Sequence, residues 1–281
     1  MDLWNWIQEH KDCMNVTGAE KALADQLRKE LDPKGGHSAI DDTGCLFVQG
    51  NQSGTVITAM MDVPGYLVLQ KYPEKSVIVY TLFNQTDRGN GFTAIGPDGK
   101  NVKVYRDKDP DSLYYIKQKR YGIGTPVKEV DLFSRNEEEI CGINAARYAL
   151  LYVLCSLSAN GANCLFASRG FSGAPVEYNF CMRHNTGSVI MLGSVESDEE
   201  RPIVLIKNGK HFSDRGLVQK AINAGFTPML SNEAVTKAQR CADSGVDVLT
   251  LALPYRLTKK CERIVRIRSV EFFLKSIQNM L

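Results

Sequence analysis

The chain has 281 residues, of which 43% are hydrophobic and 23% are charged, and its 34 basic and 32 acidic side chains leave a formal net charge of +2. This composition is typical of a folded globular protein and excludes disordered, collagenous and coiled-coil chains. It also predicts no nucleic-acid partner, because the neutralisation of phosphates needs a clustered excess of Lys and Arg. The longest apolar stretches have the length of strands, so we expect no membrane partner and no membrane-spanning segment.

The start of the chain and the cysteines both point to an intracellular protein. The first residues contain no basic region followed by an apolar one, so we expect no secretory signal and a cytoplasmic location. No two of the eight cysteines have the spacing of a Cys-x-x-Cys motif. We therefore expect free thiols rather than zinc ligands or a redox pair.

The first 64 residues alternate between helical and strand patterns. A helix is predicted from Leu3, and Thr17-Gly-Ala-Glu20 has the pattern of a capping box, in which the Thr17 hydroxyl and the Glu20 carboxylate each bond a free amide of the next helix. That helix has one apolar stripe, formed by Leu23, Leu27 and Leu31. Strands are predicted over residues 39–48 and 55–61, and the second is apolar enough to be covered on both faces.

Between residues 65 and 135 the pattern changes to short strands separated by turn residues. Strands are predicted over residues 76–80, 92–95 and 102–105, and Pro97-Asp-Gly99 between the last two is a hairpin turn. No helical period is present in this region. We therefore predict a small all-β domain, residues 65–135, inserted into a larger domain.

After residue 136 helices and strands alternate again. Helices are predicted over residues 143–157, 172–181 and 214–224 and from Ser269 to the C-terminus, and strands over residues 163–167, 189–192, 203–206 and 246–253. This alternation predicts an α/β domain made of residues 1–64 and 136–281, with a mostly parallel sheet flanked by helices.

Several segments together resemble one enzyme family. Ile57-Thr-Ala-Met-Met-Asp62-Val-Pro-Gly65 resembles the segment Ala-His-Met-Asp-x-x-Gly of the glutamyl-aminopeptidase and deblocking-aminopeptidase family, dinuclear metallo-aminopeptidases that form tetrahedral dodecamers. Gly170-Phe-Ser-Gly173-Ala174 is similar to its Gly-x-Arg-Gly-Ala, and Gly245-Val246, Pro254 and Arg256 are similar to its last segments. In that family an inserted β domain also follows the first segment directly. The resemblance implies a metallo-exopeptidase-like fold with the inserted domain as an oligomerisation module.

The residues that carry the chemistry of this family are absent from the matching positions. The family holds two divalent metals such as Zn or Co with two His and three carboxylates, and a further Glu acts as the general base. The resemblance places those functions on Met60, Gly142, Ala167, Ser168, Gly193 and Lys259. Thioether, glycine, alanine and ammonium groups do not bind such metals. Asp62, which orients the first metal His in the family, is present without that His. The matched positions therefore imply no metal, no other cofactor and no catalytic residue.

Basic residues stand close to these positions in the sequence. If Arg169, Lys237, Arg256 and Lys259 converge, they would form a cationic pocket for a peptide or a small anionic ligand. The alternative is that these long side chains extend into solvent or pair with nearby acids.

Three functions follow from these observations. The first is a catalytically inactive relative of the aminopeptidases, a pseudoenzyme that forms homo-oligomers or hetero-oligomers with an active relative, or that binds the ligand described above. The second is an active metal-dependent aminopeptidase with a rearranged metal site, which needs Asp62, His184 or His211 to converge with nearby carboxylates. The third is a metal-independent hydrolase that uses Ser168 or Ser172, and it needs a base within hydrogen-bond reach of the serine.

Overall fold

The structure is a computed structural model that describes residues 2–32, 37–51, 54–72, 76–81, 91–106, 114–117, 121–169 and 175–281. The segment Gly170-Phe-Ser-Gly173-Ala174, with the candidate nucleophile Ser172, lies outside the described residues. None of the described helices is long and apolar enough to cross a membrane.

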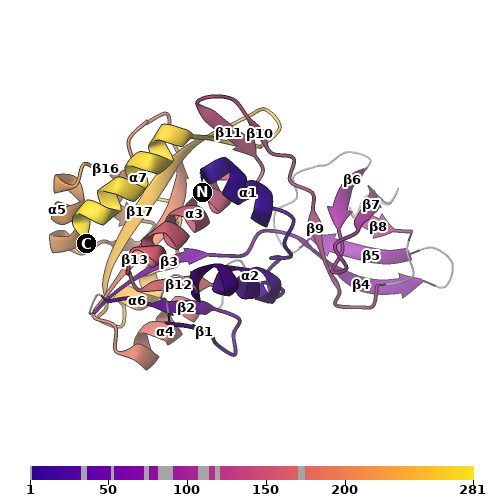
Figure 1. Cartoon of the computed structure of the whole chain (residues 1–281), viewed down its shortest axis with the longest axis horizontal. Coiled ribbons are helices and arrows are strands. Elements are labelled where there is room, and N and C mark those ends of the chain that lie inside the picture. Colours follow the sequence, from indigo (N-terminus) through magenta and orange to yellow (C-terminus); the bar gives the residue numbers. More distant parts are fainter. Residues whose placement is uncertain are drawn as a thin grey trace.

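A large mixed sheet forms the body of the protein (Figure 1). Its described strands follow the order β1-β2-β12-β3-β13-β17-β18-β11-β10, and β14, β15 and β16 extend it beside β17. The strands are β1 (His37–Ile40), β2 (Leu46–Gln49), β3 (Thr55–Met60), β10 (Ser134–Arg135), β11 (Glu139–Gly142), β12 (Cys164–Ala167), β13 (Ser188–Glu196), β14 (Ile203–Asn208), β15 (His211–Phe212), β16 (Thr227–Ser231), β17 (Asp247–Leu257) and β18 (Arg263–Arg266). The parallel part of the sheet is its centre, where β12, β3, β13 and β17 lie side by side.

Helices cover both faces of this centre, as parallel strands require. They are α1 (Leu3–His10), α2 (Lys21–Leu31), α3 (Ala145–Ala159), α4 (Val176–His184), α5 (Arg215–Asn223), α6 (Ala238–Ala242) and α7 (Ile267–Met280). Alternate residues of β3 point to opposite faces: Ile57 belongs to the main core with α1, α3 and α7, whereas Val56 packs with residues of α4. The sequence thus places α3 and α4 on opposite sides of one strand.

The predicted all-β region contains a closed antiparallel barrel. The barrel strands are β4 (Tyr66–Tyr72), β5 (Ser76–Thr81), β6 (Gly91–Ile95), β7 (Asn101–Arg106), β8 (Tyr114–Ile116) and β9 (Pro126–Glu129), in the order β4-β5-β8-β7-β6-β9. The buried residues that the structure describes there form a core inside it: Tyr66, Val68, Ala94, Val102, Val104, Tyr114, Ile116, Tyr121 and Val127. The barrel lies at the right of Figure 1, away from the large sheet.

One buried lysine ties the barrel to the α/β part. Lys128 of β9 is 1% exposed, and its ammonium group donates to the carbonyl oxygens of Lys11 (2.6 Å) and Cys13 (2.7 Å) and to the Tyr148 hydroxyl of α3 (2.6 Å). These three acceptors use all three of its protons. Burial lowers the pKa of Lys128 to about 8.

Most predicted elements are confirmed, with three local corrections. The single strand predicted over residues 39–48 is a hairpin, because the Asp41 carboxylate accepts the amides of Thr43 and Cys45 and turns the chain between β1 and β2. The helix from Ser269 begins instead at Ile267, and the Ser269 hydroxyl donates to the Glu200 carbonyl rather than capping the helix. All eight cysteines are free thiols, as expected. The third correction, at the predicted capping box, concerns the candidate site.

Candidate functional site

Three of the positions singled out in the sequence lie in one row at the carboxyl end of the parallel strands. Ala167 of β12 is paired with Met60 of β3. The pairing of β3 with β13 runs from Thr55 and Ser188 to Thr58 and Met191, and the same register continued by two residues would place Gly193 beside Met60. Carboxyl ends of parallel strands are where α/β folds place their ligands. This row is our candidate site.

Asp62 follows the row directly and is fully buried. Its carboxylate accepts a hydrogen bond of 2.8 Å from the Thr17 hydroxyl. Thr17 therefore does not cap α2, and the first half of the predicted capping box is wrong. The tertiary contact prevails because it satisfies a buried carboxylate, whereas the amides at the exposed start of a helix can bond water.

Glu20 is likewise recruited to the site. Its carboxylate accepts the backbone amide of Arg169 at 2.6 Å and makes no capping bond to α2. Burial raises the pKa of Glu20, while the bond from the Arg169 amide acts in the opposite direction. Arg169 has a left-handed backbone (φ 52°), a conformation that costs energy for a residue with a side chain. The second half of the predicted capping box thus holds the loop that follows β12.

Two cations accompany the carboxylates of the site. Arg147, near the start of α3, donates to the Met60 carbonyl at 3.3 Å, and its charge interacts favourably with Asp62. Lys237, at the start of α6, interacts in the same way with Glu177 and Asp62. Glu177 of α4 is 5% exposed, and burial raises its pKa. Buried carboxylates therefore lie within electrostatic reach of basic side chains at this edge of the sheet.

Neighbouring side chains occupy the space where acidic metal ligands would extend from two glycines. A Cβ atom on Gly142 would lie 2.6 Å from a ring carbon of Phe133 and 3.0 Å from a carboxylate oxygen of Asp131. A Cβ atom on Gly193 would lie 3.0 Å from the methyl group of Thr236. Both glycines therefore permit close packing that an Asp at either position would disrupt.

Ser168 is buried and bonded within the β1–β2 turn. Its hydroxyl donates to the Thr43 carbonyl at 2.7 Å and lies 3.3 Å from the Cys45 sulfur. Among the described residues no His, Asp or Glu hydrogen-bonds to it. Ser168 therefore lacks the adjacent base that a serine nucleophile requires.

The four basic residues singled out in the sequence do not lie together. Lys237 Nζ donates to the Arg169 carbonyl at 3.4 Å, so these two residues are adjacent. Arg256 instead forms an ion pair with Glu139. Lys259 is exposed in the turn after β17. Ala252 is the β17 partner of Gly193. The turn begins more than five residues after Ala252, or roughly 16 Å along an extended strand, so Lys259 lies away from the candidate site.

The histidines considered for a rearranged metal site lie toward the other end of the sheet. His184 lines a pocket with Val56, and His211 bonds the backbone of Val248. Val56 and Val248 precede the row of the candidate site by four residues, roughly 13 Å along the strands, and Asp62 lies beyond that row. The three side chains therefore do not converge.

The residues present do not fit a pair of divalent metals. Within the part of the chain that the structure describes, no group of three or more His, Cys, Asp or Glu side chains could hold a metal ion. The cationic side chains of Arg147 and Lys237 stand beside the carboxylates that remain. We therefore derive no metal-dependent step for this site.

Sequence reasoning did not assign Thr17, Glu20, Arg147 or Glu177 to the site. One signal was available for Arg147, since it is the only charged residue of α3, a helix that is otherwise apolar or uncharged around its circumference. An isolated charge in a buried helix requires a specific partner. Nothing local in the sequence indicated the other three contacts.

No protein-family model and no curated protein matches the sequence. Solved structures do match along nearly the whole chain. A TET aminopeptidase from a marine sediment archaeon of the Thaumarchaeota has a TM-score of 0.83 at 12% identity, over 99% of this chain and 95% of that one. The TET1 peptidase of Pyrococcus horikoshii, which can assemble into a tetrahedron or a large octahedral shell, has a TM-score of 0.81 at 14% identity, over 99% and 98%. An aminopeptidase from the archaeon Desulfurococcus kamchatkensis has a TM-score of 0.81 at 13% identity, over 98% and 94%.

These matches establish the class of the fold. The chain has the α/β fold of these aminopeptidases, with a large sheet flanked by helices and a smaller antiparallel sheet beside it. At such identities the likeness extends to the fold and not to the activity.

Proposed function

We propose that this chain is a pseudoenzyme, a degenerate member of the glutamyl-aminopeptidase and deblocking-aminopeptidase family, which acts by binding and assembly rather than by hydrolysis. The observation that carries the proposal is the favourable electrostatic interaction of Arg147 and Lys237 with the buried carboxylates of Asp62 and Glu177, beside the strand ends at Met60 and Ala167. Basic side chains there interact with carboxylates as metal ions would, but they activate no water.

The ligand that we propose for this site is a peptide. A pocket of about 510 Å³ adjoins it and is lined by the acids Glu20, Asp25, Asp41 and Asp42 and by the bases Lys21, Arg28 and Arg169. Both signs of charge suit the charged ends and side chains of a peptide better than a lone small anion. Of the cationic group predicted in the sequence, only Arg169 and Lys237 support this role, because Arg256 is engaged by Glu139 and Lys259 is exposed in a turn.

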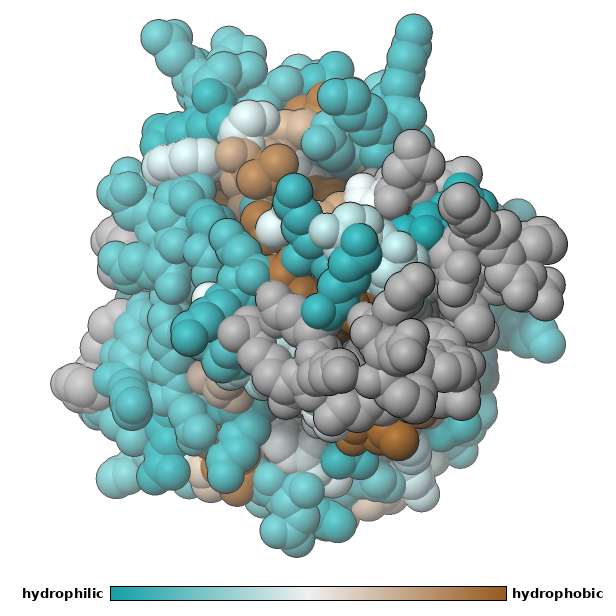
Figure 2. Space-filling model, turned by 90° about the vertical axis from the view of Figure 1, so that its right-hand side faces the viewer, coloured by the Kyte–Doolittle hydropathy of each residue, from teal (hydrophilic) through white to brown (hydrophobic). Residues whose placement is uncertain are grey.

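Assembly is the second part of the proposal. We propose that residues 65–135 form an inserted domain that joins copies of this chain to one another or to an active relative. Leu69 and Ile123 of this region are 49% and 70% exposed, and the bond from Gly124 to Val68 brings them close together. Figure 2 shows that the described surface at this end of the molecule is mostly hydrophilic, with small hydrophobic areas. The assembly of the TET1 peptidase of Pyrococcus horikoshii into a tetrahedron or a large octahedral shell supports this part of the proposal.

The proposal is tested by measuring metal content and aminopeptidase activity together. We expect less than stoichiometric metal in the purified protein and no release of p-nitroaniline from amino-acid p-nitroanilides when Co²⁺, Zn²⁺ or Mn²⁺ is added. An unblocked peptide should bind to the protein in calorimetric titrations. The double variant Arg169→Ala, Lys237→Ala should weaken the affinity for that peptide about tenfold. The control Lys275→Ala alters an exposed lysine of α7.

A contrary result is equally specific. Stoichiometric metal, with turnover that a chelator removes and that is lost in Asp62→Asn, would show an active enzyme with a rearranged metal site. Turnover that the Asp62→Asn substitution leaves unchanged indicates a contaminating peptidase. The activity assay is then repeated on protein from which that peptidase has been removed.

A further inference from the structure

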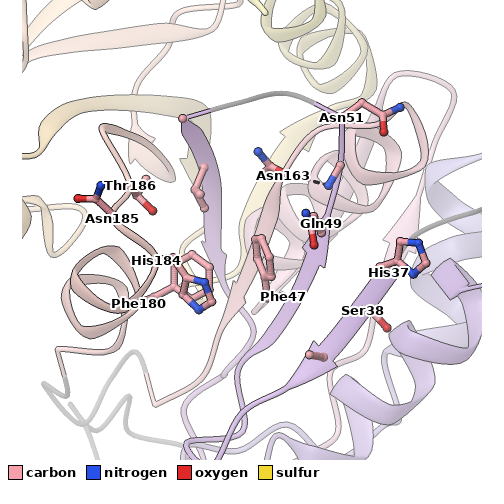
Figure 3. Close-up of a pocket in the computed structure, with 14 residues that line it drawn as sticks. His37, Ser38, Phe47, Gln49, Asn51, Asn163, Phe180, His184, Asn185 and Thr186 are labelled. Atoms are coloured by element: carbon pink, nitrogen blue, oxygen red, sulfur yellow. Dashed lines mark hydrogen bonds between the residues drawn. The ribbon is translucent and has the colours of Figure 1, made fainter.

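A second pocket lies at the opposite end of the parallel strands from the candidate site. It has a volume of about 670 Å³ and opens between α4 and the β1–β2 hairpin (Figure 3). Its floor includes Val56 near the start of β3 and Asn163 before β12, whereas the candidate site lies at the carboxyl ends of these strands. The pocket is therefore separate from the function proposed above, and either proposal can fail without the other.

An aromatic wall forms one side of this pocket. Phe180 and His184 of α4 are stacked with their ring centres 4.1 Å apart, and Phe47 of β2 lies 4.7 Å from Phe180 and 5.7 Å from His184. These distances are those of rings in direct contact. No flat ring can insert between them, so the wall offers an outer surface rather than a slot.

Most of the other side chains of the lining are polar, beside Ala39 and Val56. His37 and Gln49 are directly paired across the β1–β2 hairpin, and Asn185 ends α4 with a left-handed backbone. In the described part of the chain, no protein group hydrogen-bonds the side-chain amide of Gln49 or Asn185. Each amide offers two donors and an acceptor. The described lining contains no Lys, Arg, Asp or Glu.

Strand periodicity explains why this lining gathers on one face. Phe47 and Gln49 are two residues apart on β2 and point to the same side, and Ala39 and His37 are their partners on β1. The intervening Val48 points into the main core instead. The lining is thus a product of the hairpin register and not of a chance arrangement of loops.

We propose that this pocket binds a neutral saccharide. A sugar ring presents C–H groups on its faces, which pack on an aromatic wall, and hydroxyl groups at its edge, which both donate to and accept from carboxamides. A phosphate or carboxylate ligand would lack a fixed opposite charge in the lining. A nucleobase is usually held between two apolar or aromatic groups, and this wall has no such gap. A smaller hollow of about 110 Å³ shares Phe47, Phe180 and His184 with the pocket and extends the aromatic wall.

The test is saturation-transfer NMR on the intact chain with methyl glucoside, N-acetylglucosamine, maltose and cellobiose, and with adenosine and uridine as the competing ligand class. We expect saturable binding of at least one sugar, with the strongest transfer to the protons on the ring face. Gln49→Ala and His184→Ala alter two exposed side chains of the pocket and should each weaken that binding by about fivefold or more. The control Gln278→Ala alters an exposed amide on α7 and should change nothing.

Three results overturn the proposal. They are the absence of binding by all four sugars, binding of the nucleosides alone, and sugar binding that Gln49→Ala and His184→Ala leave unchanged. Circular dichroism of each variant shows whether its fold is retained. Because both substituted side chains are exposed, we expect every variant to fold as the parent does.

Discussion

At the scale of single residues, Arg147 shows how the site differs from a metal centre. It extends from the first turn of α3 to the Met60 carbonyl, and its charge interacts with Asp62. Burial lowers the pKa of Arg147, but a guanidinium group is basic enough to remain charged. Asp62 is fully buried and needs this positive charge, since an unpaired buried carboxylate is costly.

We predict that Arg147→Met destabilises the protein by about 2 to 4 kcal/mol, because it leaves the buried Asp62 carboxylate without a cation on that side. Asp62→Asn in the same background should restore part of this loss. Urea denaturation of the parent, both single variants and the double variant measures the coupling between the two positions. Strictly additive effects would show that Arg147 contributes to stability by packing alone.

At the scale of elements, the start of α3 depends on a carboxylate that lies outside the helix, 12 residues before Ile143. The Asp131 carboxylate accepts the amides of Ile143 (2.8 Å) and Asn144 (2.7 Å), the donors that precede α3. Gly142 lies directly before them, against Phe133 and Asp131. The geometry of this helix start thus requires a residue without a side chain at position 142.

Gly142→Ala should therefore destabilise the protein by about 1 to 3 kcal/mol, because the new methyl group must displace Phe133 and the capping carboxylate of Asp131. Gly122→Ala is the matched control, since a Cβ atom there would meet nothing within 4 Å and its φ is not in the left-handed region. It should leave stability unchanged or raise it slightly. Chemical denaturation of both variants measures the contrast, and equal losses at the two glycines would contradict the packing argument.

At the scale of the whole molecule, Lys128 connects the barrel to the α/β part. Its lowered pKa, about 8 against an ordinary 10.5, is caused mainly by burial. Below pH 8 the lysine is charged in both the folded and the unfolded protein. Between pH 8 and 10.5 the unfolded protein binds this proton more tightly, so the contribution of Lys128 to stability rises with pH.

We predict that Lys128→Met is less stable than the parent at neutral pH, since three buried acceptors lose their donor. This deficit should grow by up to about 2 kcal/mol between about pH 7.5 and 9.5, because only the parent gains from deprotonation of the lysine. Burial raises the pKa of Tyr148 well above 10, and that group acts in the opposite direction at higher pH, so the comparison stays below pH 10.

Denaturation at several pH values, with calorimetry to follow the barrel and the α/β part, checks this prediction. Lys103→Met, which alters an exposed lysine of the barrel, is the control and should show a deficit that is independent of pH. A deficit of Lys128→Met that shrinks as the pH rises would contradict the assignment.

Local patterns in the sequence sufficed for most of the architecture. The apolar stripe of Leu23, Leu27 and Leu31 predicted α2, and the continuous apolar run after Thr55 predicted a central strand. These features depend on the burial of side chains at fixed helical or strand spacing, and that spacing can be read along the chain. The fold class follows from the order of such segments.

Only the tertiary structure decided how the polar residues are used. Thr17 and Glu20 have the spacing of a capping box, yet they bond Asp62 and the Arg169 amide, which lie 45 and 149 residues further along the chain. Those partners are close only because parallel strands bring their carboxyl ends to one edge of the sheet. Hydrogen bonds and charges favour whichever partner the fold brings near and shields from water, and sequence spacing does not specify that partner.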